Sequence, residues 1–179
     1  DLPPERRDII TSGRPFYIVI TLLLGIVGFL VLKGAPQLQA TIPKIIFAGL
    51  LLIHIGLHWV SGLSTLHPKS GFSYLFVQLV LGMSLVLISG MPELALAVFA
   101  TLVGETIGVF GITRFSVIFV IIFMLITPLS YIMIGGGETF QRWISPTLST
   151  FPILIAIMVL FRRQNEASDR ASQLATELE

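Results

Sequence analysis

The sequence contains no cysteine and little charge. Of its 179 residues 12% are charged, whereas charged residues make up about 25% of an ordinary soluble domain. The absence of cysteine excludes disulfide frameworks, thiolate metal sites and cysteine nucleophiles, although it does not fix the redox compartment. The net charge of +1 gives no basic field to attract phosphates at long range, so no nucleic-acid partner is expected.

Recognisable catalytic motifs are missing as well. The sequence has no GxGxxG, GxxxxGK[ST], HExxH, GxSxG or CxxC pattern. We therefore expect no catalytic centre within these residues. Apolar side chains are plentiful instead, at 54% of the residues, and the mean hydropathy is +0.92. This composition excludes an ordinary soluble domain and a disordered chain, and it indicates an integral membrane protein in contact with the lipid bilayer.

The apolar residues lie in runs long enough to cross a membrane. A bilayer core about 30 Å thick requires roughly 20 apolar residues in a helix. We predict six such spans, over 15–32, 45–66, 72–91, 94–113, 115–134 and 143–161. The runs are continuous and do not alternate, which favours helices over a barrel. The expected fold class is thus all-α, a polytopic bundle of six transmembrane helices.

Short polar segments separate the predicted spans. Gly135-Gly136-Gly137 predicts a flexible break that opens an outer loop over 135–142. An even number of crossings places both termini on one side, and the Lys and Arg residues then divide eight to three in favour of that side. This asymmetry predicts cytoplasmic termini. Because only Arg114 separates the fourth and fifth runs, a five-crossing chain with termini on opposite faces is the alternative.

The C-terminal residues differ in composition from the rest. Residues 1–14 form a cytoplasmic N-terminal segment, 15–161 the transmembrane domain and 162–179 a juxtamembrane helix that begins at the anchor Arg162-Arg163. Apolar residues in this helix are spaced 4, 3 and 4 apart, which is a heptad seam. We predict that the last span continues into a coiled-coil stem of a homodimer, although an amphipathic tail on the lipid surface is the alternative. The seam consists of Ala167, Ala171, Leu174 and Leu178.

The sixth span, its Arg162-Arg163 boundary and the polar helix over 164–179 together resemble the membrane input region of multi-span sensor histidine kinases of bacterial two-component systems. The resemblance implies a sensory and dimerising module in the bacterial inner membrane. It also implies a kinase core beyond residue 179 that would use ATP and Mg²⁺ and would phosphorylate a response regulator. The phosphoacceptor and ATP-binding boxes of that family do not occur here. We therefore expect a segment of a longer polypeptide, as its start at Asp1 and its end within a helix also indicate.

Two other readings remain open. The chain could be a small ion- or proton-coupled transporter or a channel protomer, or it could be an accessory subunit of a larger membrane complex. A transporter predicts a water-accessible path to Glu105, and a subunit predicts apolar outer faces covered by unlike chains.

Four polar residues lie inside the predicted spans, where such residues are costly. His54 and His58 share one face of the second span, Gln78 lies in the third and Glu105 in the fourth. The helical rise puts all four at similar depths, roughly 14 to 20 Å from the outer end of their spans. We therefore predict that they meet in one layer inside the bundle, with Glu105 near at least one histidine.

The role of this polar layer is open at the level of sequence. The side chains could simply satisfy one another and fix helix register. They could form a site that responds to protons, ions or a ligand, or, with two histidines and a carboxylate, hold a metal or haem. We assign no metal site and no cofactor to this segment. Four aromatic residues towards span ends are expected to be interfacial anchors, namely Trp59, Tyr74, Tyr131 and Trp143. The spacing of Gly104, Gly108 and Gly111 would permit close helix approach.

Overall fold

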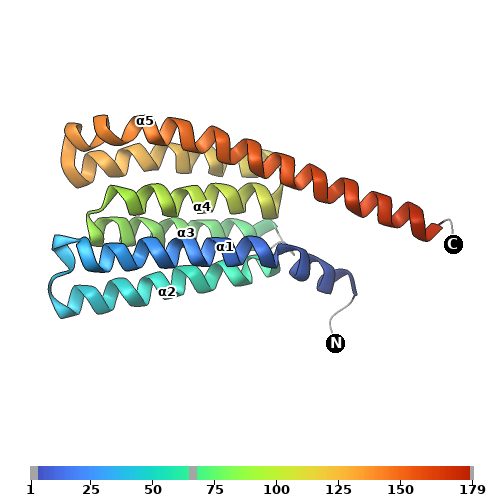
Figure 1. The fold of residues 1–179 in the computed structure, drawn as a ribbon, viewed down its shortest axis with the longest axis horizontal. Coiled ribbons are helices and arrows are strands. Elements are labelled where there is room, and N and C mark those ends of the chain that lie inside the picture. The colour runs from blue at the N-terminus through green and yellow to red at the C-terminus, as the bar shows by residue number, and fades with distance from the viewer. Residues whose placement is uncertain (1–3, 65–67, 178–179) are drawn as a thin grey trace.

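The computed structural model describes residues 4–64 and 68–177, and within these ranges the regular structure is entirely helical. The all-α prediction is confirmed. The helices lie side by side in an elongated bundle, and the C-terminal part of the chain extends from one end of it (Figure 1). The elements are α1 (Pro4–Gly34), the short 3-10 helix η1 (Pro36–Leu38), α2 (Thr41–Ser64), α3 (Pro68–Ser89), α4 (Pro92–Phe110) and α5 (Arg114–Glu177).

Five helices in the described ranges are long and apolar enough to span a membrane. The last of them, α5, contains two antiparallel arms. Its backbone is not helical at Gly135 and Gly136. The Tyr131 hydroxyl lies 2.7 Å from Thr147 Oγ1, whereas 16 residues of straight helix would separate them by about 24 Å. The chain therefore folds back at the glycines (Figure 1), and we call residues 114–134 the first arm and 137–177 the second arm.

The turn between the two arms is tighter than the sequence predicts. The predicted outer loop over 135–142 is wrong, because the helix continues through this range except at Gly135 and Gly136. Gly136 has φ +68°, a conformation that glycine adopts at little cost because it has no Cβ. Two residues therefore suffice to reverse the chain, and the residues that follow them extend the second arm.

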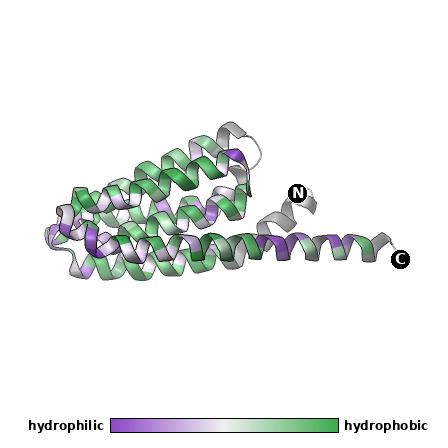
Figure 2. Cartoon of the chain, turned by 90° about the horizontal axis from the view of Figure 1, so that it is seen from above, coloured by the Kyte–Doolittle hydropathy of each residue, from purple (hydrophilic) through white to green (hydrophobic). Residues whose placement is uncertain are grey.

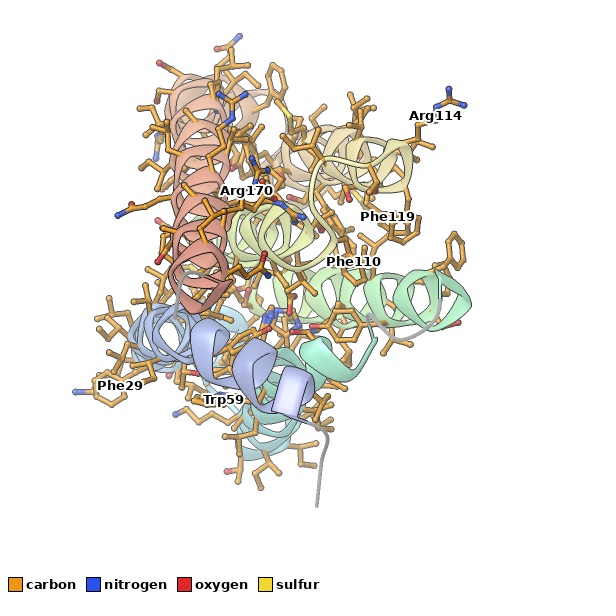
Figure 3. The ribbon with its side chains drawn as sticks, turned by 90° about the vertical axis from the view of Figure 1, so that its right-hand side faces the viewer. Phe29, Trp59, Phe110, Arg114, Phe119 and Arg170 are labelled. Atoms are coloured by element: carbon orange, nitrogen blue, oxygen red, sulfur yellow. The ribbon has the colours of Figure 1, made fainter. Side chains whose placement is uncertain are left out.

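Helix α4 lies at the centre of the bundle. Of its span 72% is buried, against 28–39% for the other candidate spans. Viewed along the bundle, α4 is surrounded by the other helices (Figure 3). Its apolar and small residues occur all around the helix, which is the pattern of a helix without a solvent face. Pro92 at its first turn and Gly111 (φ +71°) just after it set its ends.

The outside of the bundle is apolar. Figure 2 shows hydrophobic residues over most of the bundle helices and hydrophilic residues along much of the helix that extends to the C-terminus. Large side chains such as Leu52 and Leu125 are about two-thirds exposed or more. An apolar surface of this kind cannot face water over its whole extent, so the bundle is a membrane protein in contact with lipid.

The polar end of the second arm is a continuous helix as far as Glu177. We call residues 162–177 the stem. Ala167, Ala171 and Leu174 are exposed on it, and Leu178, the fourth predicted seam residue, lies outside the described residues. The coiled-coil pairing of two stems remains a prediction.

Candidate functional site

The four polar residues predicted to meet inside the bundle do lie together. His54, His58, Gln78 and Glu105 are fully buried. Nδ1 of His58 on α2 lies 2.8 Å from Oε2 of Glu105 on α4. Gln78 on α3 donates to the backbone carbonyl of His54, at 3.3 Å. The geometric prediction is thus confirmed, while the role of the group remains a prediction.

Tyr74 is a further member of this polar cluster, which sequence reasoning missed. Its hydroxyl donates to Oε1 of Glu105 at 2.7 Å and accepts from Nε2 of Gln78 at 3.0 Å. The expectation that Tyr74 is an interfacial anchor is wrong, since the residue is buried. Its position four residues before Gln78, on the same face of α3, was the available signal.

Glu105 therefore connects three helices. Its two carboxyl oxygens contact His58 of α2 and Tyr74 of α3. A carboxylate can only accept hydrogen bonds, so an ionised Glu105 takes one proton-donating partner from each neighbour. The pair formed by Glu105 and His58 is wholly buried. Water therefore cannot easily take the place of either partner.

Helix α1 joins the cluster through Tyr17 and Ser61. Ser61 Oγ lies 2.8 Å from the Tyr17 hydroxyl and 2.8 Å from the carbonyl oxygen of His58. The carbonyl can only accept, so the single hydroxyl proton of Ser61 points to it, and Tyr17 donates to Ser61. The same α2 helix segment that holds His58 is in this way also tied to α1.

Several polar atoms of the cluster have no hydrogen-bond partner among the described residues. They are both ring nitrogens of His54, Nε2 of His58 and Oε1 of Gln78. The ring of His54 packs edge-on against that of His58, with 4.9 Å between centroids. Within the described residues, no group of three or more acidic or histidine side chains is arranged to hold a metal ion.

A second contact region links α4 to the second arm through glycine. Gly104 and Gly108 of α4 and Gly111 just after it approach the second arm at about one-turn intervals, and a Cβ at Gly104 would lie closer still to Phe16 of α1, at 3.5 Å. A Cβ added to Gly104 would lie 3.8 Å from Leu154, one added to Gly108 would lie 2.9 Å from Met158, and one added to Gly111 would meet the Arg162 guanidinium. The glycine spacing thus serves packing within the chain, as small residues do between membrane helices.

Arg162 closes this contact at the C-terminal end of α4. Its Nη1 lies 3.5 Å from the carbonyl oxygen of Ile107, and its Nε donates to Glu166 at 2.8 Å. A cation at this place faces the negative end of the helix dipole, and the Ile107 carbonyl that it contacts also accepts from the Gly111 N–H at 3.0 Å. Arg162 is therefore more than the expected juxtamembrane anchor, whereas Arg163 next to it is exposed.

Of the other predicted anchors, Tyr131 is also buried and bonds across the two arms to Thr147, whereas Trp59 is 47% exposed. Comparison of the chain with models of protein families, with curated proteins and with solved structures found no significant match.

Proposed function

We propose that this chain is the transmembrane sensory and dimerisation module of a two-component sensor histidine kinase. In this proposal the second arm of α5 relays a membrane or intramembrane signal to a cytoplasmic kinase core that follows residue 179, and that core phosphorylates a response regulator. The last span and the stem resemble the membrane input regions of such kinases, and this resemblance supports the proposal that a kinase core is attached.

The observation that carries the proposal is the glycine contact between α4 and the second arm. Helix α4 holds Glu105, the central residue of the polar cluster, and its next two turns pack directly on Met158 and Arg162. Arg162 is also the first residue of the stem. Because glycine has no side chain, Met158 and Arg162 of the second arm approach the backbone at Gly108 and Gly111 closely. We expect a displacement of α4 to be passed through this contact to the second arm at the base of the stem.

The proposed topology has six crossings, with each arm of α5 spanning once. The first arm has the length for this, since residues 114–134 extend about 31 Å as a helix. The end of the bundle that bears the stem is the end assigned eight of the eleven Lys and Arg residues. The positive-inside rule favours cytoplasmic termini, and the resemblance to bacterial sensor kinases supports the bacterial inner membrane as the location in this proposal.

The proposed dimer forms through the stem. Ala167, Ala171 and Leu174 are exposed along the helix, and an exposed seam at heptad spacing is what a second copy would cover. Cysteine crosslinking in membranes tests this directly, because the chain has no cysteine of its own. We expect rapid disulfide formation for Leu174→Cys and Ala171→Cys. Gln173→Cys, exposed on the same helix but outside the seam, is the matched control and should form disulfides slowly.

Relay is tested by combining the crosslink with a change in the cluster. In the Leu174→Cys background, Glu105→Gln should alter the crosslinking rate severalfold, whereas Glu138→Gln, exposed at the other end of the bundle, should leave it unchanged. Equal rates for Leu174→Cys and Gln173→Cys would refute the stem dimer. An unchanged rate in Glu105→Gln would refute the relay.

A small proton-coupled transporter is the second candidate, and the buried pair of His58 and Glu105 favours it. Intramembrane acidic and histidine residues often form proton relays. Purified chain in proteoliposomes with a pH-sensitive dye would then show a proton flux that Glu105→Gln abolishes. A flux of this kind together with an unpaired stem would replace the sensor by a transporter. Co-purification of unlike chains in fixed ratio would instead indicate an accessory subunit.

A further inference from the structure

An apolar groove opens on the surface of the bundle where α4 meets both arms of α5. Its volume is about 150 Å³. Its walls come from the end of α4, the start of the first arm and the facing part of the second arm, and they include Ile107, Gly111, Val117, Val120 and Val159. The bottom of the groove is buried, while Val117 at its edge is 46% exposed to the surroundings of the bundle.

The groove lies directly beside a cation. Two of its lining residues, Ile107 and Gly111, are the residues that Arg162 contacts, through the Ile107 carbonyl and across the bare Cα of Gly111. The apolar walls therefore lead to a guanidinium group at the end of the bundle that bears the stem. A molecule that fits both features has an extended hydrocarbon portion and an anionic group at one end.

Arg162 has hydrogen-bonding capacity left for such an anion. A guanidinium carries five N–H donors in a planar fork. Glu166 receives the Nε donor and the Ile107 carbonyl receives one from Nη1, so three N–H bonds remain for a further acceptor. The side chain is 36% exposed, which gives an incoming group access. Two parallel N–H donors match the geometry of a phosphate.

The neighbouring arginines do not share this position. Arg114 points outward from the bundle, away from the second arm (Figure 3), and Arg163 is exposed one residue further along the stem. Arg162 is the arginine that is both packed on α4 and adjacent to the groove. It is held there before any ligand binds, and this lowers the entropic cost of binding.

We propose that the groove binds one anionic phospholipid from the leaflet on the stem side, with an acyl chain between α4 and the two arms and the phosphate on Arg162. The site requires the membrane-spanning bundle but no kinase core, so it stands independently of the proposed function. The bound phosphate would take the N–H donors that Glu166 and the Ile107 carbonyl leave unused, which would make the site sensitive to the anionic lipid content of the membrane.

Native mass spectrometry of the full chain tests the proposal. The chain is reconstituted in nanodiscs that contain equal amounts of phosphatidylglycerol and phosphatidylcholine, released, and examined for retained lipid. We expect one phosphatidylglycerol to be retained in preference to phosphatidylcholine. Arg162→Gln should lower its retention about tenfold or more, the effect of losing a hydrogen bond to a charged group. The matched variant Arg163→Gln should change it less than about twofold, as for an exposed surface charge.

The hydrocarbon part of the site is tested separately. Val117→Trp would fill the edge of the groove and should reduce retention of phosphatidylglycerol, whereas Ile153→Trp, on an exposed apolar face of the second arm, should not. This pair also decides the outcome if Arg162→Gln fails to fold, as judged by circular dichroism. Glycerol 3-phosphate, which has no acyl chain, should not be retained.

Three results would overturn the proposal. Equal retention of the two phospholipids would mean that the groove is filled by bulk lipid. Equal effects of Arg162→Gln and Arg163→Gln would mean that anionic lipid is attracted by surface charge alone. Retention of glycerol 3-phosphate would mean that the site is a phosphate site without a lipid requirement.

Discussion

Replacement of Glu105 tests whether the polar cluster holds the bundle together. Glu105→Leu removes two interhelical hydrogen bonds, of 2.8 Å to His58 and 2.7 Å to Tyr74. Hydrogen bonds between membrane helices contribute about 0.6 kcal/mol on average and up to about 1.7 kcal/mol. Both bonds are short and fully buried, so we expect the free energy of unfolding to fall by about 1–3 kcal/mol.

A double-mutant cycle isolates the contact with His58. His58→Leu combined with Glu105→Leu should cost about 1 kcal/mol less than the sum of the single changes, because the two residues share one bond. The control cycle pairs Glu105→Leu with Tyr131→Phe, whose hydroxyl bonds to Thr147 and not to the cluster, and it should be additive within about 0.5 kcal/mol. Unfolding by dodecyl sulfate in mixed micelles, followed by far-ultraviolet circular dichroism, measures each value. Additivity in the His58 cycle would refute the argument that this pair stabilises the bundle.

Three further changes address the histidine ring without partners, the arm hairpin and the end of α4. His54→Leu should leave the free energy of unfolding unchanged or raise it by up to about 1 kcal/mol, because it removes two buried unpaired nitrogens. If His54→Leu lowered the free energy of unfolding as much as His58→Leu does in the same titration, this explanation would be wrong. Tyr131→Phe should lower the free energy of unfolding by about 0.6 kcal/mol, because the hydrogen bond to Thr147 is lost. In a Thr147→Val background, where that bond is already absent, thermal unfolding should show no further destabilisation by Tyr131→Phe. Gly111→Ala should destabilise by about 1 kcal/mol or more, because φ is +71° and Arg162 fills the space of a Cβ. Gly137→Ala, with open space around it, is the control, and a lower melting temperature for it than for Gly111→Ala would count against the explanation.

The long apolar runs made most of the fold predictable. A run of about 20 apolar residues has few stable alternatives to a helix in a bilayer, because every backbone polar group must be satisfied within it. The hairpin in α5 could also be located, since it falls at the predicted break of three glycines, where Gly136 adopts φ +68°. The length of the turn could not be predicted, because it depends on how Tyr131 and Thr147 pack across the two arms.

The depth argument found the histidines, Gln78 and Glu105 but placed Tyr74 wrongly. That argument counted from the first apolar residue, whereas α3 begins at Pro68, four residues before the predicted start at 72. Tyr74 therefore lies more than one turn further into its helix than the sequence indicates. A tyrosine is also ambiguous by nature, because its ring suits the interface and its hydroxyl suits a buried partner.

The contact of Arg162 with α4 lay beyond sequence reasoning for a different reason. Arg162 and Ile107 are 55 residues apart, and their meeting depends on the antiparallel return of the second arm. A row of basic residues after a span is fully explained by the membrane boundary, so nothing in the sequence distinguishes Arg162 from Arg163. Arg162 differs from Arg163 in the folded chain because its guanidinium lies against Gly111.

The position of α4 explains why a polar cluster in the membrane and a stem outside it could act together. Helices at the edge of a bundle can shift against lipid, but α4 is enclosed by its neighbours and bound to α2 and α3 through Glu105. A change in the bonding of Glu105 would alter the position that these two helices impose on α4. Gly108, one turn after Glu105, lies against Met158, and Gly111, just after α4, lies against Arg162, so the second arm approaches closely where the movement would be passed on. Larger residues that merely tightened this contact should therefore disturb the stem as much as changes in the cluster do, and Gly108→Ala offers that comparison in the Leu174→Cys crosslinking assay.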